Sequence, residues 1–245
     1  MEIFSDYDLG SKLNFHYQNA KPFPNIIIDD FINPVVAMQC FSELKNTNFW
    51  VTEDGNNPYM TDNQVNKWFT PWDDASVEQL RYETPTVSTV LRYFNSPIFL
   101  QFLKDLTGIP NLIPDPHLWG GGCHKIDNGG RLNLHVDYNI NPLTEKFRVL
   151  NMLLYLNPNW EDEWRGHLEL WNKKEKRREH MVAPIMNRAV IFTLSDDSVH
   201  GHPAPLNCPE GFERYSIAMY YFVDEPNQEY YERTYVHWHN ELQSH

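Results

Sequence analysis

A histidine and a carboxylate lie two residues apart in the segment 131–137, which reads RLNLHVD. Apolar and polar residues alternate along this segment, which predicts a strand with His135 and Asp137 on the same face. A second histidine would complete a facial triad for a transition metal and leave three adjacent coordination positions for a chelating cosubstrate and dioxygen. His200, which follows the strand-like segment 188–194, is the best candidate for that third ligand. Taken alone, the pair also fits a surface histidine beside a strand-end turn.

Two further residues could bind a dicarboxylic cosubstrate. Arg214 begins the strand-like segment 214–222, fourteen positions after His200. Its guanidinium could hold a carboxylate through two parallel hydrogen bonds. Tyr155 could donate a hydroxyl hydrogen bond to the same carboxylate. The alternatives are an arginine in an edge salt bridge and an interior tyrosine bonded to a backbone carbonyl.

The elements that must position these residues are mostly strands. The helical stripe of residues 34–46 begins at a proline, and two helices follow a polar loop at 50–75. The clearer of these two begins after Ser96 as N-cap and ends at Gly108. From residue 112 onward, short strands separated by turns predict an antiparallel sandwich or jelly roll. The predicted strands are 22–30, 131–137, 148–157, 167–171, 188–194 and 214–223.

The composition excludes several classes of protein. The 245 residues carry a formal net charge of −13, which disfavours nucleic-acid and membrane-surface partners. Three widely spaced cysteines provide neither a disulfide framework nor a zinc motif. The N-terminus lacks the features of a signal peptide and no segment has the length of a membrane span, so a cytoplasmic protein is expected.

The segment from about residue 112 to 224 resembles the catalytic core of the prolyl 4-hydroxylase-like family of Fe(II)- and 2-oxoglutarate-dependent dioxygenases. The matching pieces occur in the order of the family: GGGCH (120–124), GGRLNLHVDYN (129–139), RVLNMLLYLNPNW (148–160), GHLELW (166–171), APIMNRAVIF (183–192), SVHGHPAPL (198–206) and ERYSIAMYYF (213–222). The resemblance implies a mainly β protein with supporting helices (α+β), built on a double-stranded β-helix of the jelly-roll or cupin kind.

The resemblance also implies roles for individual residues. His135, Asp137 and His200 match the iron ligands of the family, and Arg214 matches its basic residue for 2-oxoglutarate. Tyr155 matches a tyrosine that hydrogen-bonds the same cosubstrate. His124 falls near a position where many members have a tyrosine, and it is included as a further cosubstrate residue.

The implied reaction is hydroxylation of a C–H bond with dioxygen, releasing succinate and CO2, with ascorbate as a candidate reductant. Asp137 matters here, because related halogenases have a small residue at this position where chloride binds. A prolyl residue in a peptide or protein is the favoured substrate. A free amino acid or another small metabolite is the alternative.

Other classes fit the sequence less well. A nucleic-acid demethylase on the same core disagrees with the acidic charge. A catalytically inactive binding module disagrees with the complete set of ligands, and a structural zinc site would be expected to include cysteine.

The whole chain is expected to form one dioxygenase domain. Residues 1–111 would supply helical support and a candidate lid at 62–68, residues 112–224 the core, and residues 225–245 a C-terminal tail with exposed, incidental histidines. The basic run at 173–178 is expected at a solvated hairpin tip.

Overall fold

The computed structural model describes residues 2–6, 8–48, 50–52, 63–69, 74–226 and 235–242. Its helices are α1 (Leu9–Asn19), α2 (Pro34–Asn46), α3 (Asp74–Glu83), α4 (Pro85–Phe94) and α5 (Pro97–Thr107), with short 3-10 helices η1 (Asp162–Trp164) and η2 (Asn240–Leu242). Its strands are β1 (Asn25–Ile28), β2 (Val51–Thr52), β3 (Gln64–Phe69), β4 (Gly122–Val136), β5 (Phe147–Tyr155), β6 (Leu168–Asn172), β7 (Arg177–Val182), β8 (Arg188–Thr193), β9 (Ser198–His202), β10 (Arg214–Val223) and β11 (His237–Trp238).

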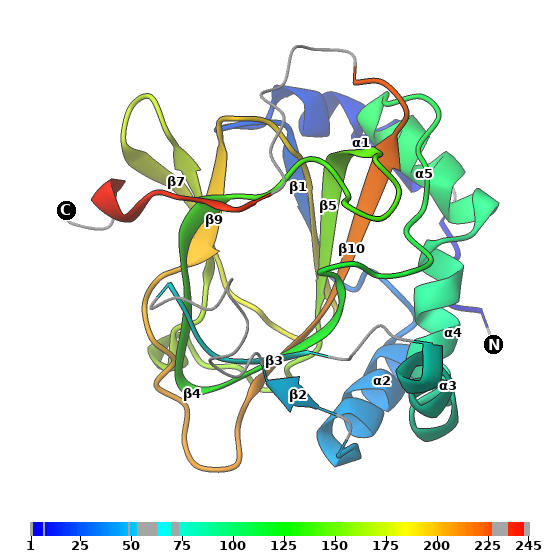
Figure 1. Cartoon of the computed structure of the whole chain (residues 1–245), viewed down its shortest axis with the longest axis vertical. Coiled ribbons are helices and arrows are strands. Elements are labelled where there is room, and N and C mark those ends of the chain that lie inside the picture. Colours follow the sequence, from blue (N-terminus) through cyan, green and yellow to red (C-terminus); the bar gives the residue numbers. More distant parts are fainter. Residues whose placement is uncertain are drawn as a thin grey trace.

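The strands form one antiparallel sheet that curls so that its two halves face each other (Figure 1). β4 belongs to both halves, since its first part pairs with β10 and its last part pairs with β9. The first half continues from β10 through β5 and β8 to β1, and the second continues from β9 through β6 to β7. Two facing layers joined in this way form a double-stranded β-helix, which confirms the predicted fold class.

Glycines allow β4 to pass from one half of the sheet to the other. Gly129 has a φ of 76°, a conformation that side-chain-bearing residues rarely adopt. A Cβ at Gly130 would lie 2.5 Å from a methyl carbon of Ile126 and 2.9 Å from the backbone oxygen of Val65. The chain can therefore bend tightly here, with the metal-ligand segment on the far side of the bend.

The helices cover the outer face of the half that contains β5 and β10 (Figure 1). The main hydrophobic core lies between them and this half, and α4 and α5 contribute many of its aromatic and aliphatic side chains. α5 begins where the Ser96 hydroxyl accepts a hydrogen bond from the Phe99 amide, and it ends at Gly108 with a φ of 71°. Both ends of this helix and the bounds of α2 agree with the sequence predictions. The basic run also lies where it was predicted, across the turn between β6 and β7.

Two expectations about local structure need correction. The expected loop at 50–75 contains strands β2 and β3, and β3 pairs along β4, so residues 64–68 of the candidate lid belong to the sheet. Three helices, α3 to α5, follow the segment where two were expected, and α1 was not predicted.

Of the tail histidines, which were expected to be exposed, His237 is exposed and His239 is not. His237 and Trp238 form β11 against the end of β4, and His239 is buried. A two-residue strand is too short to show an alternation of polar and apolar residues, so only its pairing with β4 identifies it as a strand. His245 and residue 62 lie outside the described residues.

None of the described helices is both long and apolar enough to cross a membrane.

Candidate metal and cosubstrate site

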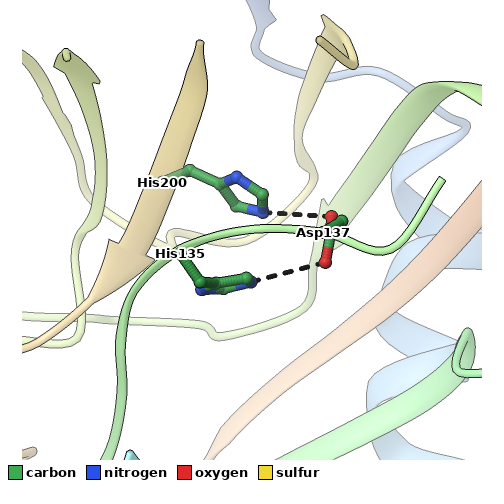
Figure 2. Close-up of side chains that lie close together, drawn as sticks. All are labelled: His135, Asp137 and His200. Atoms are coloured by element: carbon green, nitrogen blue, oxygen red, sulfur yellow. Dashed lines mark ion pairs between the residues drawn. The ribbon is translucent and has the colours of Figure 1, made fainter. Parts of the chain in front are cut away.

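The pairing of β4 with β9 brings the two histidines together. His135 and His200 are direct cross-strand partners, and their ring centroids lie 4.4 Å apart. Asp137 follows the end of β4 and turns its carboxylate toward both rings (Figure 2). The His135 Nε2 lies 3.4 Å from Asp137 Oδ1, and the His200 Nε2 lies 3.3 Å from Asp137 Oδ2. One ligand atom from each residue can be chosen so that all three lie within 4.8 Å of one another.

Backbone carbonyls orient both imidazoles. The Nδ1 of His135 lies 2.8 Å from the backbone oxygen of Asn133, and the Nδ1 of His200 lies 2.8 Å from that of Ser198. A carbonyl oxygen can only accept, so each Nδ1 carries a proton, and Nε2 is the nitrogen of each ring that faces Asp137. Burial lowers the pKa of His135, and the neighbouring His200 lowers it further. The His135 ring is therefore neutral at pH 7, as a metal ligand must be.

The Asp137 carboxylate stays ionised although it is buried. Burial alone would raise its pKa, but the Arg148 guanidinium, assisted by His200, holds the pKa of Asp137 well below its usual range. The Nη2 of Arg148 and the Nδ2 of Asn151 both donate to Asp137 Oδ2 over 2.8 Å. Asp137 Oδ1 therefore remains available to a cation on the side facing His135.

Arg214 and Tyr155 are adjacent on neighbouring strands of the other half of the sheet. The guanidinium carbon of Arg214 lies 4.7 Å from the centroid of the Tyr155 ring, and Arg214 Nε donates to the backbone oxygen of Gly166 over 2.8 Å. Burial lowers the pKa of Arg214. No carboxylate among the described residues forms an ion pair with this guanidinium. A buried, unpaired cation is costly, so this position fits a carboxylate ligand.

The Tyr155 hydroxyl can serve the same ligand. It is buried and makes no hydrogen bond of standard geometry within the described residues. Burial raises the pKa of Tyr155 although the charge of Arg214 opposes this, so the hydroxyl stays protonated and can donate. The sequence left open that Tyr155 is an interior tyrosine bonded to a backbone carbonyl. Within the described residues its hydroxyl makes no such bond.

His124 lies in the same cross-strand row. Ser216 of β10 pairs with His124 on one side and with Tyr155 on the other, so these side chains share a face. Burial, followed by the charges of Lys67 and Arg214, lowers the pKa of His124 well below its ordinary value. His124 is therefore a neutral ring at neutral pH, placed beside the arginine.

The structure adds residues that the sequence did not single out. Arg148 and Asn151 bind Asp137, and the Trp238 ring of β11 packs 5.3 Å from the His135 ring. Lys67 of β3 and Arg214 of β10 both pair with Ile126 of β4, one from each side, so their side chains lie on the same face of the sheet. One signal in the sequence was usable: Arg148 is a lone charge in an apolar run, and such a charge needs a buried partner. Lys67 falls within the segment 62–68 predicted as a candidate lid, and nothing comparable marked Trp238.

The residues present fit a divalent metal and a dicarboxylic cosubstrate. Two imidazole nitrogens and one ionised carboxylate converge in a buried cluster, which suits a divalent transition metal with open coordination positions. The Arg214 guanidinium and the Tyr155 hydroxyl lie together, and no carboxylate among the described residues pairs with this guanidinium. This arrangement suits the far carboxylate of a ligand that chelates the metal at its other end.

Comparison with known proteins agrees with this geometry. Residues 121–222 match the sequence profile of the 2OG-Fe(II) oxygenase superfamily. No curated protein sequence matches the chain. Among solved structures, a prolyl hydroxylase from Trichoplax adhaerens in complex with a hypoxia inducible factor peptide fragment is 18% identical, with a TM-score of 0.56 over 89% of this chain and 90% of that one.

Two further structures have the same fold. A prolyl-4-hydroxylase from Pseudomonas putida is 14% identical, with a TM-score of 0.58 over 89% of this chain and 100% of that one. HygX from Streptomyces hygroscopicus, with nickel and 2-oxoglutarate bound, is 11% identical, with a TM-score of 0.55 over 92% of this chain and 96% of that one. Over residues 121–222 the chain is thus similar to the 2OG-Fe(II) oxygenase superfamily, and its fold is shared with prolyl hydroxylases.

Proposed function

We propose that this protein hydroxylates a C–H bond of its substrate, with Fe(II) bound by His135, Asp137 and His200. The observation that carries the proposal is the buried cluster of these three side chains, with both Nε2 atoms directed at the carboxylate. Arg214 and Tyr155 would hold the far carboxylate of 2-oxoglutarate, with His124 beside them. When bound, iron, 2-oxoglutarate and dioxygen would together supply the oxidising power, with release of succinate and CO2.

The protein's own residues contribute orientation and exclusion of water. The backbone carbonyls of Asn133 and Ser198 fix the histidine tautomers, so the metal-binding nitrogens are preorganised. Burial of the triad and of Arg214 keeps the local dielectric low, which strengthens the attraction between the guanidinium and a carboxylate.

We favour a prolyl residue in a peptide or protein as the substrate. The support is the fold shared with prolyl hydroxylases, one of which is in complex with a peptide fragment. The second candidate is a small molecule, since HygX, with the same fold, has been solved with hygromycin B bound. The two are separated by screening prolyl peptides and small metabolites for succinate release that depends on substrate.

The first test is anaerobic addition of Fe(II) and 2-oxoglutarate, with observation of the weak visible charge-transfer band of the chelated complex. We expect the band in the wild type and not in His135→Ala. Absence of the band from folded, metal-loaded wild type would refute the oxygenase proposal and favour an inactive binding module.

A Tyr155→Phe substitution is expected to weaken 2-oxoglutarate binding by about 10- to 150-fold. A hydrogen bond to a charged group contributes about 1.5–3 kcal/mol, and phenylalanine keeps the ring while removing the donor. Titration of the charge-transfer band measures the affinity. Tyr221→Phe is the matched control, because this buried tyrosine of β10 donates to the backbone oxygen of Phe94, away from the site. Equal losses in both variants would contradict the role of Tyr155.

A further inference from the structure

Asp137 is held by two donors that reach the same oxygen. Arg148 Nη2 and Asn151 Nδ2 each lie 2.8 Å from Oδ2, and Arg148 Nε donates to Asn151 Oδ1 over 2.8 Å. The three side chains are buried and form a closed triangle of hydrogen bonds. The triangle determines how the carboxylate is rotated, because Oδ2 is committed to it and Oδ1 is not.

An irregularity in the sheet makes this arrangement possible. Arg148 and Asn151 are three apart on β5, and in a regular strand they would point to opposite faces. The pairing of β5 with β10 shifts register, so that Tyr221 pairs with Leu150 while the next residue pairs with Arg148. β5 therefore has one extra residue at this point, a β-bulge that turns Arg148 to the face of Asn151.

Two tyrosines fix the guanidinium in place. Its central carbon lies 3.3 Å from the ring centroid of Tyr220 and 4.8 Å from that of Tyr138. The hydroxyl of Tyr220 donates to the backbone oxygen of Gly120, and that of Tyr138 to the backbone oxygen of Trp119. Both rings are thus tied to one turn, and Arg148 cannot easily leave Asp137.

We propose that Arg148 and Asn151 are positioning residues of the metal site. They hold Asp137 by Oδ2 and present Oδ1 as a one-oxygen ligand beside His135 and His200. The inference rests on the proposed function in assigning Asp137 as a metal ligand. A carboxylate without this hold could rotate, or could bind the metal through both oxygens and occupy a position that the cosubstrate needs.

The test compares metal binding by two asparagine variants without any cosubstrate. Asn151→Ala removes one donor and leaves the net charge unchanged. Asn187→Ala is the matched control, since Asn187 is equally buried but bonds only the backbone of Ile32 through its side chain. We expect Asn151→Ala to bind Mn(II) about 10- to 100-fold more weakly than wild type. Asn187→Ala is expected to lose stability while keeping its Mn(II) affinity.

A Co(II) spectrum distinguishes positioning from a general loss of structure. A changed coordination by Asp137 is expected to alter the visible absorption of Co(II)-loaded Asn151→Ala, and the control spectrum should match wild type. Arg148→Lys is a second variant, which keeps the charge but cannot bond Asn151 and Asp137 together in the same geometry. It too should bind Mn(II) more weakly.

Wild-type affinity and an unchanged Co(II) spectrum in both Asn151→Ala and Arg148→Lys would overturn the inference. Equal losses in Asn151→Ala and Asn187→Ala would overturn it as well, since the effect would then be one of stability. Failure of the proposed function is a separate result. In that case wild type would bind Mn(II) but give no charge-transfer band with Fe(II) and 2-oxoglutarate, and the Mn(II) comparison would still decide the role of the two residues.

Discussion

Replacement of Asp137 with alanine is expected to abolish metal binding and also to destabilise the metal-free protein by about 3–5 kcal/mol. The second effect follows from Arg148, which is 1% exposed and has its ion pair with Asp137. Without the carboxylate, a buried guanidinium remains uncompensated. Urea denaturation of the apoprotein measures the stability, and Mn(II) titration measures the metal binding.

Two further variants separate the effects. His200→Ala should lose metal binding with a smaller cost to the apoprotein, because no buried charge is left behind. The double variant Asp137→Ala/Arg148→Met should regain much of the lost stability without regaining the metal. If the single and double variants were equally unstable, the ion pair would not be the cause.

The same ion pair predicts how the stability of the apoprotein depends on pH. Burial acts to raise the pKa of Asp137, but the Arg148 guanidinium holds the folded-state pKa well below the ordinary value. A carboxyl group of this kind contributes stability that is present above the unfolded pKa of about 4 and is lost as the pH falls through the folded value. This acid-dependent contribution should be absent from the double variant.

The second large effect is expected at Arg214. Arg214→Met should weaken 2-oxoglutarate binding by about 30- to 4,000-fold, because removal of one partner of a buried charge pair costs about 2–5 kcal/mol. The apoprotein should keep its stability or gain some. Among the described residues no carboxylate pairs with this guanidinium, so its removal leaves no unpaired charge behind. If Arg214 instead formed a structural salt bridge, the substitution would lower stability and leave the cosubstrate affinity unchanged.

Arg188 provides the control for this experiment. It pairs with Tyr155 across β5 and β8, but its guanidinium binds the carboxylate of Asp29 near the surface. Arg188→Met should leave the titration of the charge-transfer band unchanged. A band that titrates alike in wild type and Arg214→Met would exclude Arg214 as the carboxylate partner.

The sequence by itself determined the class of fold and the residues that could bind a metal or a cosubstrate. Strict alternation over residues 131–137 predicted a strand with His135 and Asp137 on one face, because side chains in a strand repeat every two residues. Ser96 and Gly108 marked the ends of α5, because capping depends on local backbone geometry. The ordered motifs of the core identified the family, since each one records a local requirement of the fold.

Tertiary structure decided what lies beside these residues. The exact register of His200 against His135 depends on the pairing of β9 with β4, two strands separated by more than sixty residues in sequence. Trp238 reaches His135 through a two-residue strand with no detectable period. Arg148 reaches Asp137 only because a bulge shifts the face on which it lies, and a period-two reading places it on the wrong side. Local patterns specify local conformation, whereas pairing partners and bulges are settled by contacts between distant segments, which a single sequence does not display.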